Sequence, residues 1–166
     1  MKLLITLVAV TSLVQPCLAA DPLTVQDAWV RATVPGQMAT GAYMRITAAD
    51  NAKLLGVNTP LALASIHQMS MSQGVMKMAA VQGGLDLPAG TAVELKPGGY
   101  HVMLMDLKQP FTAGASVPLT LVYRDAKGRE QRLTITASVG MSGPKTTGQA
   151  MPQAMHANPH GSAVKH

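Results

Sequence analysis

Short apolar or alternating segments, separated by turn signals, run from Leu23 to about Val139 of this 166-residue chain. None of them keeps the helical apolar period of about 3.6 residues over three turns. Gly allows positive φ and Pro fixes φ near −65°, so clusters such as Val34-Pro35-Gly36 and Pro97-Gly98-Gly99 mark turns. Many short strands with a turn every eight to twelve residues or so are typical of an antiparallel β-sandwich or barrel.

We therefore expect an all-β domain over residues 21–139, with a core of Val, Leu, Ile, Ala and Trp29. Its predicted strands lie near residues 24–32, 40–46, 52–57, 65–71, 75–80, 92–95, 101–107, 116–123 and 132–139. One segment, residues 61–65, is compatible with a helical turn.

The first twenty residues have the pattern of a secretory signal peptide, with Lys2 before an apolar run and small residues at Ala19 and Ala20. The run is too short to span a bilayer core of about 30 Å, and no second long apolar run follows, so we expect no membrane anchor. Cys17 is the one cysteine and lies in this segment, where Pro16 disfavours lipid attachment. The mature chain then has no thiol, which fits export to a bacterial periplasm.

Residues 140–166 are rich in Gly, Pro, Ser, Thr and Gln and show no apolar periodicity. Such a segment buries too little surface to offset its ordering entropy, so we expect a flexible tail that contains Met and His. The net charge is +5, but the Lys and Arg residues are scattered and few aromatic residues lie among them. Nucleic-acid binding is therefore not expected.

Methionine and histidine cluster within the predicted domain. The chain has 12 Met and 5 His. Side chains two residues apart share a face of a strand, so three short runs should each present their members to one side. These runs are His67, Met69 and Met71; Met76 and Met78; and His101, Met103 and Met105.

Two imidazoles and one or two thioethers that converge at one end of the domain would select a soft metal ion. Thioether sulfur is a neutral, polarisable ligand that suits Cu(I), and imidazole binds either copper state. A site without carboxylate disfavours calcium and magnesium, and thioether is not a usual zinc ligand. An isolated Met in a strand is usually core filler, which is our interpretation of Met38 and Met44 and remains open for Met71 and Met105.

Several separated blocks resemble the periplasmic copper chaperone family PCu(A)C. The resemblance covers about residues 22–139. The blocks are Ala28-Trp29-Val30-Arg31 with Pro35-Gly36 and Tyr43, His67-Gln68-Met69-Ser70-Met71, Gly74-Val75-Met76-Lys77-Met78, and Leu95-Lys96-Pro97-Gly98-Gly99-Tyr100-His101-Val102-Met103-Leu104-Met105.

The resemblance implies a cupredoxin-like Greek-key β-sandwich that binds Cu(I) and delivers it toward the copper centre of cytochrome c oxidase or to another copper carrier. The implied ligands are His67, Met78, His101 and Met103. The spacing between Met78 and His101 is one residue longer than the family pattern, which leaves Met69 and Met76 as alternatives. In the tail, the resemblance implies a possible second site for Cu(II), with candidates Met155, His156 and His160.

Competing classes of function lack their key residues. A blue-copper electron carrier needs a thiolate, and a copper oxygenase of the N-terminal histidine type needs a first-residue His, whereas cleavage here leaves Ala20 or Asp21. No Ser/His/Asp motif, His-Glu-x-x-His motif or Gly-rich phosphate loop is present, and Asp86, Glu94 and Asp106 are interpreted as surface carboxylates. We expect a protein that is not an enzyme; copper storage or resistance, or a structural secreted sandwich, are the alternatives.

Overall fold

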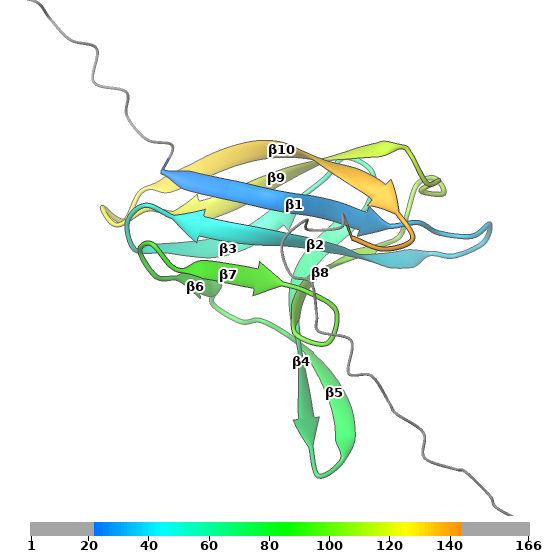
Figure 1. The fold of residues 1–166 in the computed structure, drawn as a ribbon, viewed down its shortest axis with the longest axis horizontal. Helices are drawn as coiled ribbons and strands as arrows, with labels where there is room; N and C mark the ends of the chain where they lie inside the picture. Colours follow the sequence, from blue (N-terminus) through cyan, green and yellow to red (C-terminus); the bar gives the residue numbers. More distant parts are fainter. Residues whose placement is uncertain (1–21, 144–166) are drawn as a thin grey trace, which may run out of the picture.

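The computed structural model describes residues 22–143, and these form one ten-stranded sheet that curls around a single core (Figure 1). The order of the strands is β5-β4-β8-β7-β2-β1-β10-β9-β3-β6, with an additional pairing of β8 and β2. Their bounds are β1 Leu23–Arg31, β2 Ala39–Ala48, β3 Ala52–Asn58, β4 Leu63–Ser72, β5 Val75–Ala80, β6 Leu85–Leu87, β7 Ala92–Leu95, β8 Tyr100–Met105, β9 Ser116–Arg124 and β10 Glu130–Gly140.

The all-β prediction is confirmed, and most neighbouring strands are antiparallel as expected. Two pairings are parallel, β1 with β10 and β7 with β8, so the sheet is mixed. Strand β6 was not predicted, because three residues between Gly84 and Pro88 are too few to show a period. The helical turn expected at residues 61–65 is wrong: a turn closed by the bridge between Thr59 and Ala62 leads directly into β4.

Alternation along the strands separates a core face from an outer face. On β2, Ala42, Met44 and Ile46 are buried in the core. Burial of each large side chain of this kind contributes about 1.5–3 kcal/mol. The core role expected for Met44 is thus confirmed, whereas Met38 is 59% exposed in the loop before β2 and the prediction of a core role for it is wrong.

Strands β4 and β5 form a hairpin whose tip projects from the body of the sheet (Figure 1). A two-residue turn, Gln73-Gly74, closes the hairpin, and both residues have positive φ, 52° and 76°. This pattern is typical of the tight turns that match the twist of the flanking strands and fix their register. The pairing of β4 with β5 and β8 is therefore the part of the fold that positions the candidate ligands.

Within residues 22–143, no helix is long and apolar enough to cross a membrane. The predicted signal peptide, residues 1–20, and nearly all of the predicted tail lie outside this range.

Candidate metal centre

The strand register brings the predicted ligands of the domain onto one face of three adjacent strands. His67 of β4 lies opposite His101 of β8, and Met103 lies opposite Ser65. On the other side of β4, Met69 pairs with Met78 of β5. Directly opposed residues share a face, as do residues two apart in one strand. His67, Met78, His101 and Met103 consequently all face the same side, and whether they bind a metal remains a prediction.

This side is the outer face of the sheet. The intervening residues of β8, Val102 and Leu104, are fully buried in the core, so their neighbours point away from it. Exposure rises across the three strands, from 5% for His101 on β8 to 51% for Met78 on β5. This face is thus buried in the body of the protein at β8 and exposed to solvent at β5.

The orientation of His101 is set by its own backbone. Its Nδ1 lies 3.1 Å from the carbonyl oxygen of Gly99. Because a carbonyl can only accept, Nδ1 must carry the proton and donate it. The lone pair of Nε2 is then available for a metal ion, an arrangement common among ligating histidines.

His67 carries an unpartnered ring nitrogen. Its Nε2 lies 2.8 Å from the hydroxyl oxygen of Ser65, while Nδ1 is buried and has no hydrogen-bond partner among the described residues. A buried polar atom without a partner costs about 1–3 kcal/mol. If Nε2 donates to Ser65, Nδ1 has a free lone pair, and a metal ion would supply the missing interaction. The ring centroids of His67 and His101 are 6.0 Å apart, with planes inclined by 46°.

Burial, and then the neighbouring imidazole of His101, lower the pKa of His67 below its ordinary value of 6.5. A lowered pKa means that the ring holds its proton only at more acidic pH. His67 is therefore neutral at pH 7, the state that a metal ligand requires.

The secondary candidates of the domain, Met69 and Met76, lie on this same face, since Met69 pairs with Met78 and Met76 pairs with Met71. The tail candidates Met155, His156 and His160 lie outside the described residues. Within residues 22–143, no three His, Cys, Asp or Glu side chains gather in a way that could hold a metal ion, so this centre combines only two imidazoles with thioethers.

Ser65, the hydrogen-bond partner of His67, was not predicted from the sequence. Its position two residues before His67 in a predicted strand was the available signal, because such residues share a face. The role of Gly41 was not predicted either: it lies opposite Met103 and gives room for a neighbouring ring. A Cβ at this position would approach the Tyr43 hydroxyl oxygen to 2.5 Å, so Tyr43 lies closely over the backbone beside the centre.

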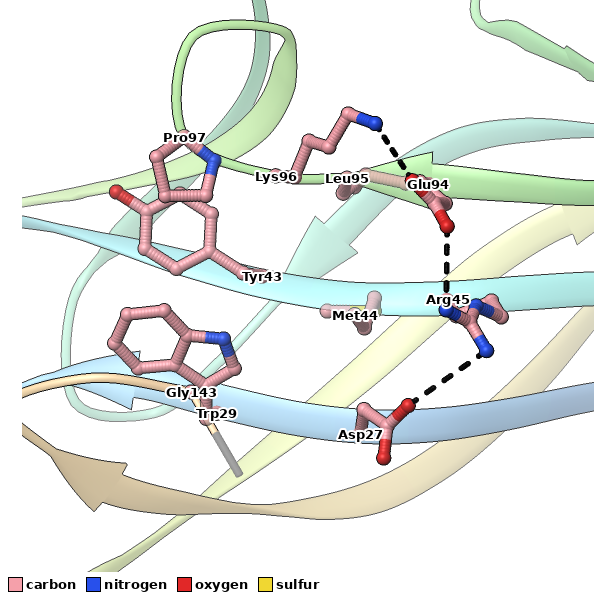
Figure 2. A pocket seen from close by; sticks show the side chains of 10 residues that line it. All are labelled: Asp27, Trp29, Tyr43, Met44, Arg45, Glu94, Leu95, Lys96, Pro97 and Gly143. Carbon is pink, nitrogen blue, oxygen red and sulfur yellow. Dashed lines mark hydrogen bonds and ion pairs between the residues drawn. The ribbon is translucent and has the colours of Figure 1, made fainter. Parts of the chain in front are cut away.

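A cavity of about 190 Å³ lies farther along the outer face (Figure 2). Trp29 and Tyr43 line it with ring centroids 4.7 Å apart. Glu94 binds Lys96 and Arg45 at 2.7 and 3.2 Å, and the hydrogen bond from Lys96 is the main reason that the pKa of Glu94 is lowered. These ion pairs agree with the interpretation of Glu94 as a surface carboxylate.

A family model described as "Putative lipoprotein LpqE-like" matches residues 23–139, the whole of the predicted domain except its first two residues. The chain belongs to the LpqE-like family. The protein named "Putative lipoprotein Lxx21020" from Leifsonia xyli subsp. xyli (strain CTCB07) is 34% identical over 107 residues. That match spans 64% of this LpqE-like chain and 64% of the relative, slightly less than two thirds of its length.

Solved structures of copper-bound proteins share the fold of this LpqE-like chain. The solution structure of CuI-DR1885 from Deinococcus radiodurans is 37% identical, with coverage of 74% of this chain and 80% of that chain and a TM-score of 0.52. The copper-bound PCuAC domain from PmoF2 is 25% identical, with coverage of 73% and 94% and a TM-score of 0.56. The resemblance to the PCu(A)C family is confirmed.

The electrostatic coupling of the two imidazoles can be tested in the metal-free protein. His101→Gln removes the neighbouring imidazole but keeps a polar side chain of similar size, so the pKa of His67 should rise toward 6.5 without reaching it, because burial remains. An NMR titration of the His67 ring measures this pKa. Lys77→Gln, which removes a charge from the opposite face of β5, is the control and should leave it unchanged. A His67 pKa that stays constant or falls in His101→Gln contradicts the coupling.

Proposed function

We propose that this protein is a periplasmic copper metallochaperone that binds Cu(I) through His67, Met78, His101 and Met103. The observation that carries the proposal is the cross-strand pair of imidazoles, His67 and His101, flanked by thioethers on the same outer face. One imidazole has a fixed tautomer and the other has a buried nitrogen without a partner among residues 22–143. A metal ion would supply a partner for the ring nitrogen that each of these imidazoles leaves free.

The chemistry of these ligands favours Cu(I) as a transported ion. All four side chains are neutral when they ligate, so the bound ion keeps a single positive charge, and soft thioethers prefer Cu(I). The half-exposed Met78 gives an incoming ligand access to the ion, whereas His101 is almost fully buried. Copper can then pass to a partner by exchange of one ligand at a time.

Relatives support copper as the cargo. DR1885 in its CuI form and the copper-bound PCuAC domain from PmoF2 share the fold and at least a quarter of the aligned residues. The recipient we propose is the copper subunit of cytochrome c oxidase or another copper carrier. The predicted signal peptide and the lipoprotein name of the matching family support a location outside the cytoplasm.

Secondary capture of Cu(II) by the tail is part of this proposal, with Met155, His156 and His160 as candidate ligands. Gly143, the last described residue, packs against Trp29, and a Cβ there would approach its indole nitrogen to 2.8 Å. Trp29 pairs with Tyr43, which shares its face with Gly41 and hence with Met103. The tail therefore begins on the same outer face as the candidate centre.

Proton competition tests the main site. Cu(I) affinity of the wild type should fall by at least about tenfold between pH 7 and pH 5, because imidazole must be neutral to ligate while thioether does not titrate. His101→Ala should weaken binding at pH 7 by about tenfold or more and reduce the pH dependence. Competition with a Cu(I) chelator measures the affinities of the wild type and of His101→Ala, each at pH 7 and at pH 5. Met38→Leu, which removes an exposed thioether outside the three ligand strands, is the control. Equal affinities in all four cases refute the assignment.

Removal of residues 144–166 tests the tail. The shortened chain should keep its Cu(I) affinity within about twofold, because the four proposed ligands remain, and should lose most of its Cu(II) uptake. Competition with a Cu(I) chelator measures the Cu(I) affinity, and metal analysis after gel filtration measures the Cu(II) stoichiometry. Unchanged Cu(II) uptake in the shortened chain would show that the tail is not the second site.

A further inference from the structure

The tip of the β4–β5 hairpin carries two methionines that the proposed centre does not use. Met71 and Met76 lie directly opposite one another, next to the turn, and are 71% and 46% exposed. The pair of Met69 and Met78 lies at the next same-face position toward the body of the protein. Four thioethers thus occupy two successive same-face positions of a two-stranded ribbon.

Both pairs occupy the closer type of cross-strand position. The backbone N–H of Val81 donates to the carbonyl of Ile66 at 2.9 Å. Ile66 and Val81 follow the register of the hairpin next to His67 and Ala80, so they occupy a hydrogen-bonded position of the ladder. Antiparallel positions alternate, so Met69 with Met78 and Met71 with Met76 fall on non-hydrogen-bonded positions. There the Cα atoms are about 4.5 Å apart and the side chains approach most closely. Two sulfur atoms can therefore meet across the strands at the tip.

Packing does not account for these side chains. Neither Met71 nor Met76 belongs to the hydrophobic core or to the residues packed against it. Five of the eight exposed large hydrophobic side chains of residues 22–143 lie on this one hairpin, namely Leu63, Met71, Val75, Met76 and Met78. Exposed apolar groups that gather in one place indicate an interaction site.

The hairpin also lacks the groups that would select a hard ion. Residues 63–80 contain no carboxylate and no cysteine, and Lys77 alternates with Met76 and Met78, so it points to the opposite face. Thioether is then the ligand type that the tip offers. Neutral, polarisable sulfur suits soft monovalent ions such as Cu(I) or Ag(I).

We propose that Met71 and Met76, with Met69 on the neighbouring position as a third thioether, form a second and weaker site for a soft monovalent cation. The pair of Met71 and Met76 lies at the hairpin tip, four residues along β4 from His67 or about 14 Å at about 3.4 Å per residue, and Met69 lies halfway between them. This second site goes beyond the proposed function, because it adds a thioether-only position next to the imidazole centre.

Methionine methyl resonances of the full chain report each site separately. In an anaerobic Cu(I) titration of protein with ¹³C-methyl methionine, the first equivalent should shift Met78 and Met103, and the second should shift Met71 and Met76. The double variant Met71→Leu/Met76→Leu should keep the first response and lose the second equivalent. Met38→Leu, with a 59% exposed thioether elsewhere, is the matched control and should keep both.

Three results overturn the second site: methyl groups of Met71 and Met76 that do not shift by two equivalents, a shift of both together with Met78 in the first equivalent, or a second equivalent that shifts only the tail methionines Met151 and Met155. The proposed function fails in a different way, since Met78 and Met103 would then not respond to the first equivalent. A response of Met71 and Met76 without Met78 and Met103 would support the tip site while contradicting the imidazole centre.

Discussion

The register of β4 between β5 and β8 is the constraint on which the candidate centre depends. It sets His67 opposite His101 and Met69 opposite Met78, so that imidazoles and thioethers from three strands share one face. A slip of β5 by one residue would turn Met76 and Met78 to the other side. The turn at Gln73-Gly74, with positive φ at both residues, holds β5 in the productive register.

Across the same three strands, the candidate ligands change from buried and oriented to exposed. His101 is buried and oriented by the Gly99 carbonyl, while Met78 is half exposed on the projecting edge strand. Burial keeps the pKa of His67 low, so its ring is neutral and ready to ligate at pH 7. The copper carrier that we propose would use this combination, because imidazoles fixed on one side would retain the ion and a thioether exposed on the other could be replaced by a partner's ligand.

The local pattern of the sequence predicted how the candidate ligands are grouped within each strand. It did not predict the features that depend on pairing between strands far apart in the sequence. The period of two correctly grouped His67 with Met69 and His101 with Met103, since that grouping follows from strand geometry alone. The adjacency of β4 and β8, more than thirty residues apart in sequence, and the parallel pairing of β1 with β10 have no local signal. The bond from Ser65 to His67 and the burial of His101 likewise depend on packing between strands.

The central claim is that Cu(I) binds to two imidazoles and two thioethers of the β5–β4–β8 face. X-ray absorption on the chain ending at Gly143, loaded with one equivalent of Cu(I), counts the neighbouring atoms directly. We expect nitrogen and sulfur scatterers in about equal number, two of each, with the sulfur signal reduced by half in Met78→Leu. A spectrum with nitrogen or oxygen scatterers alone, or with sulfur alone, would contradict the account.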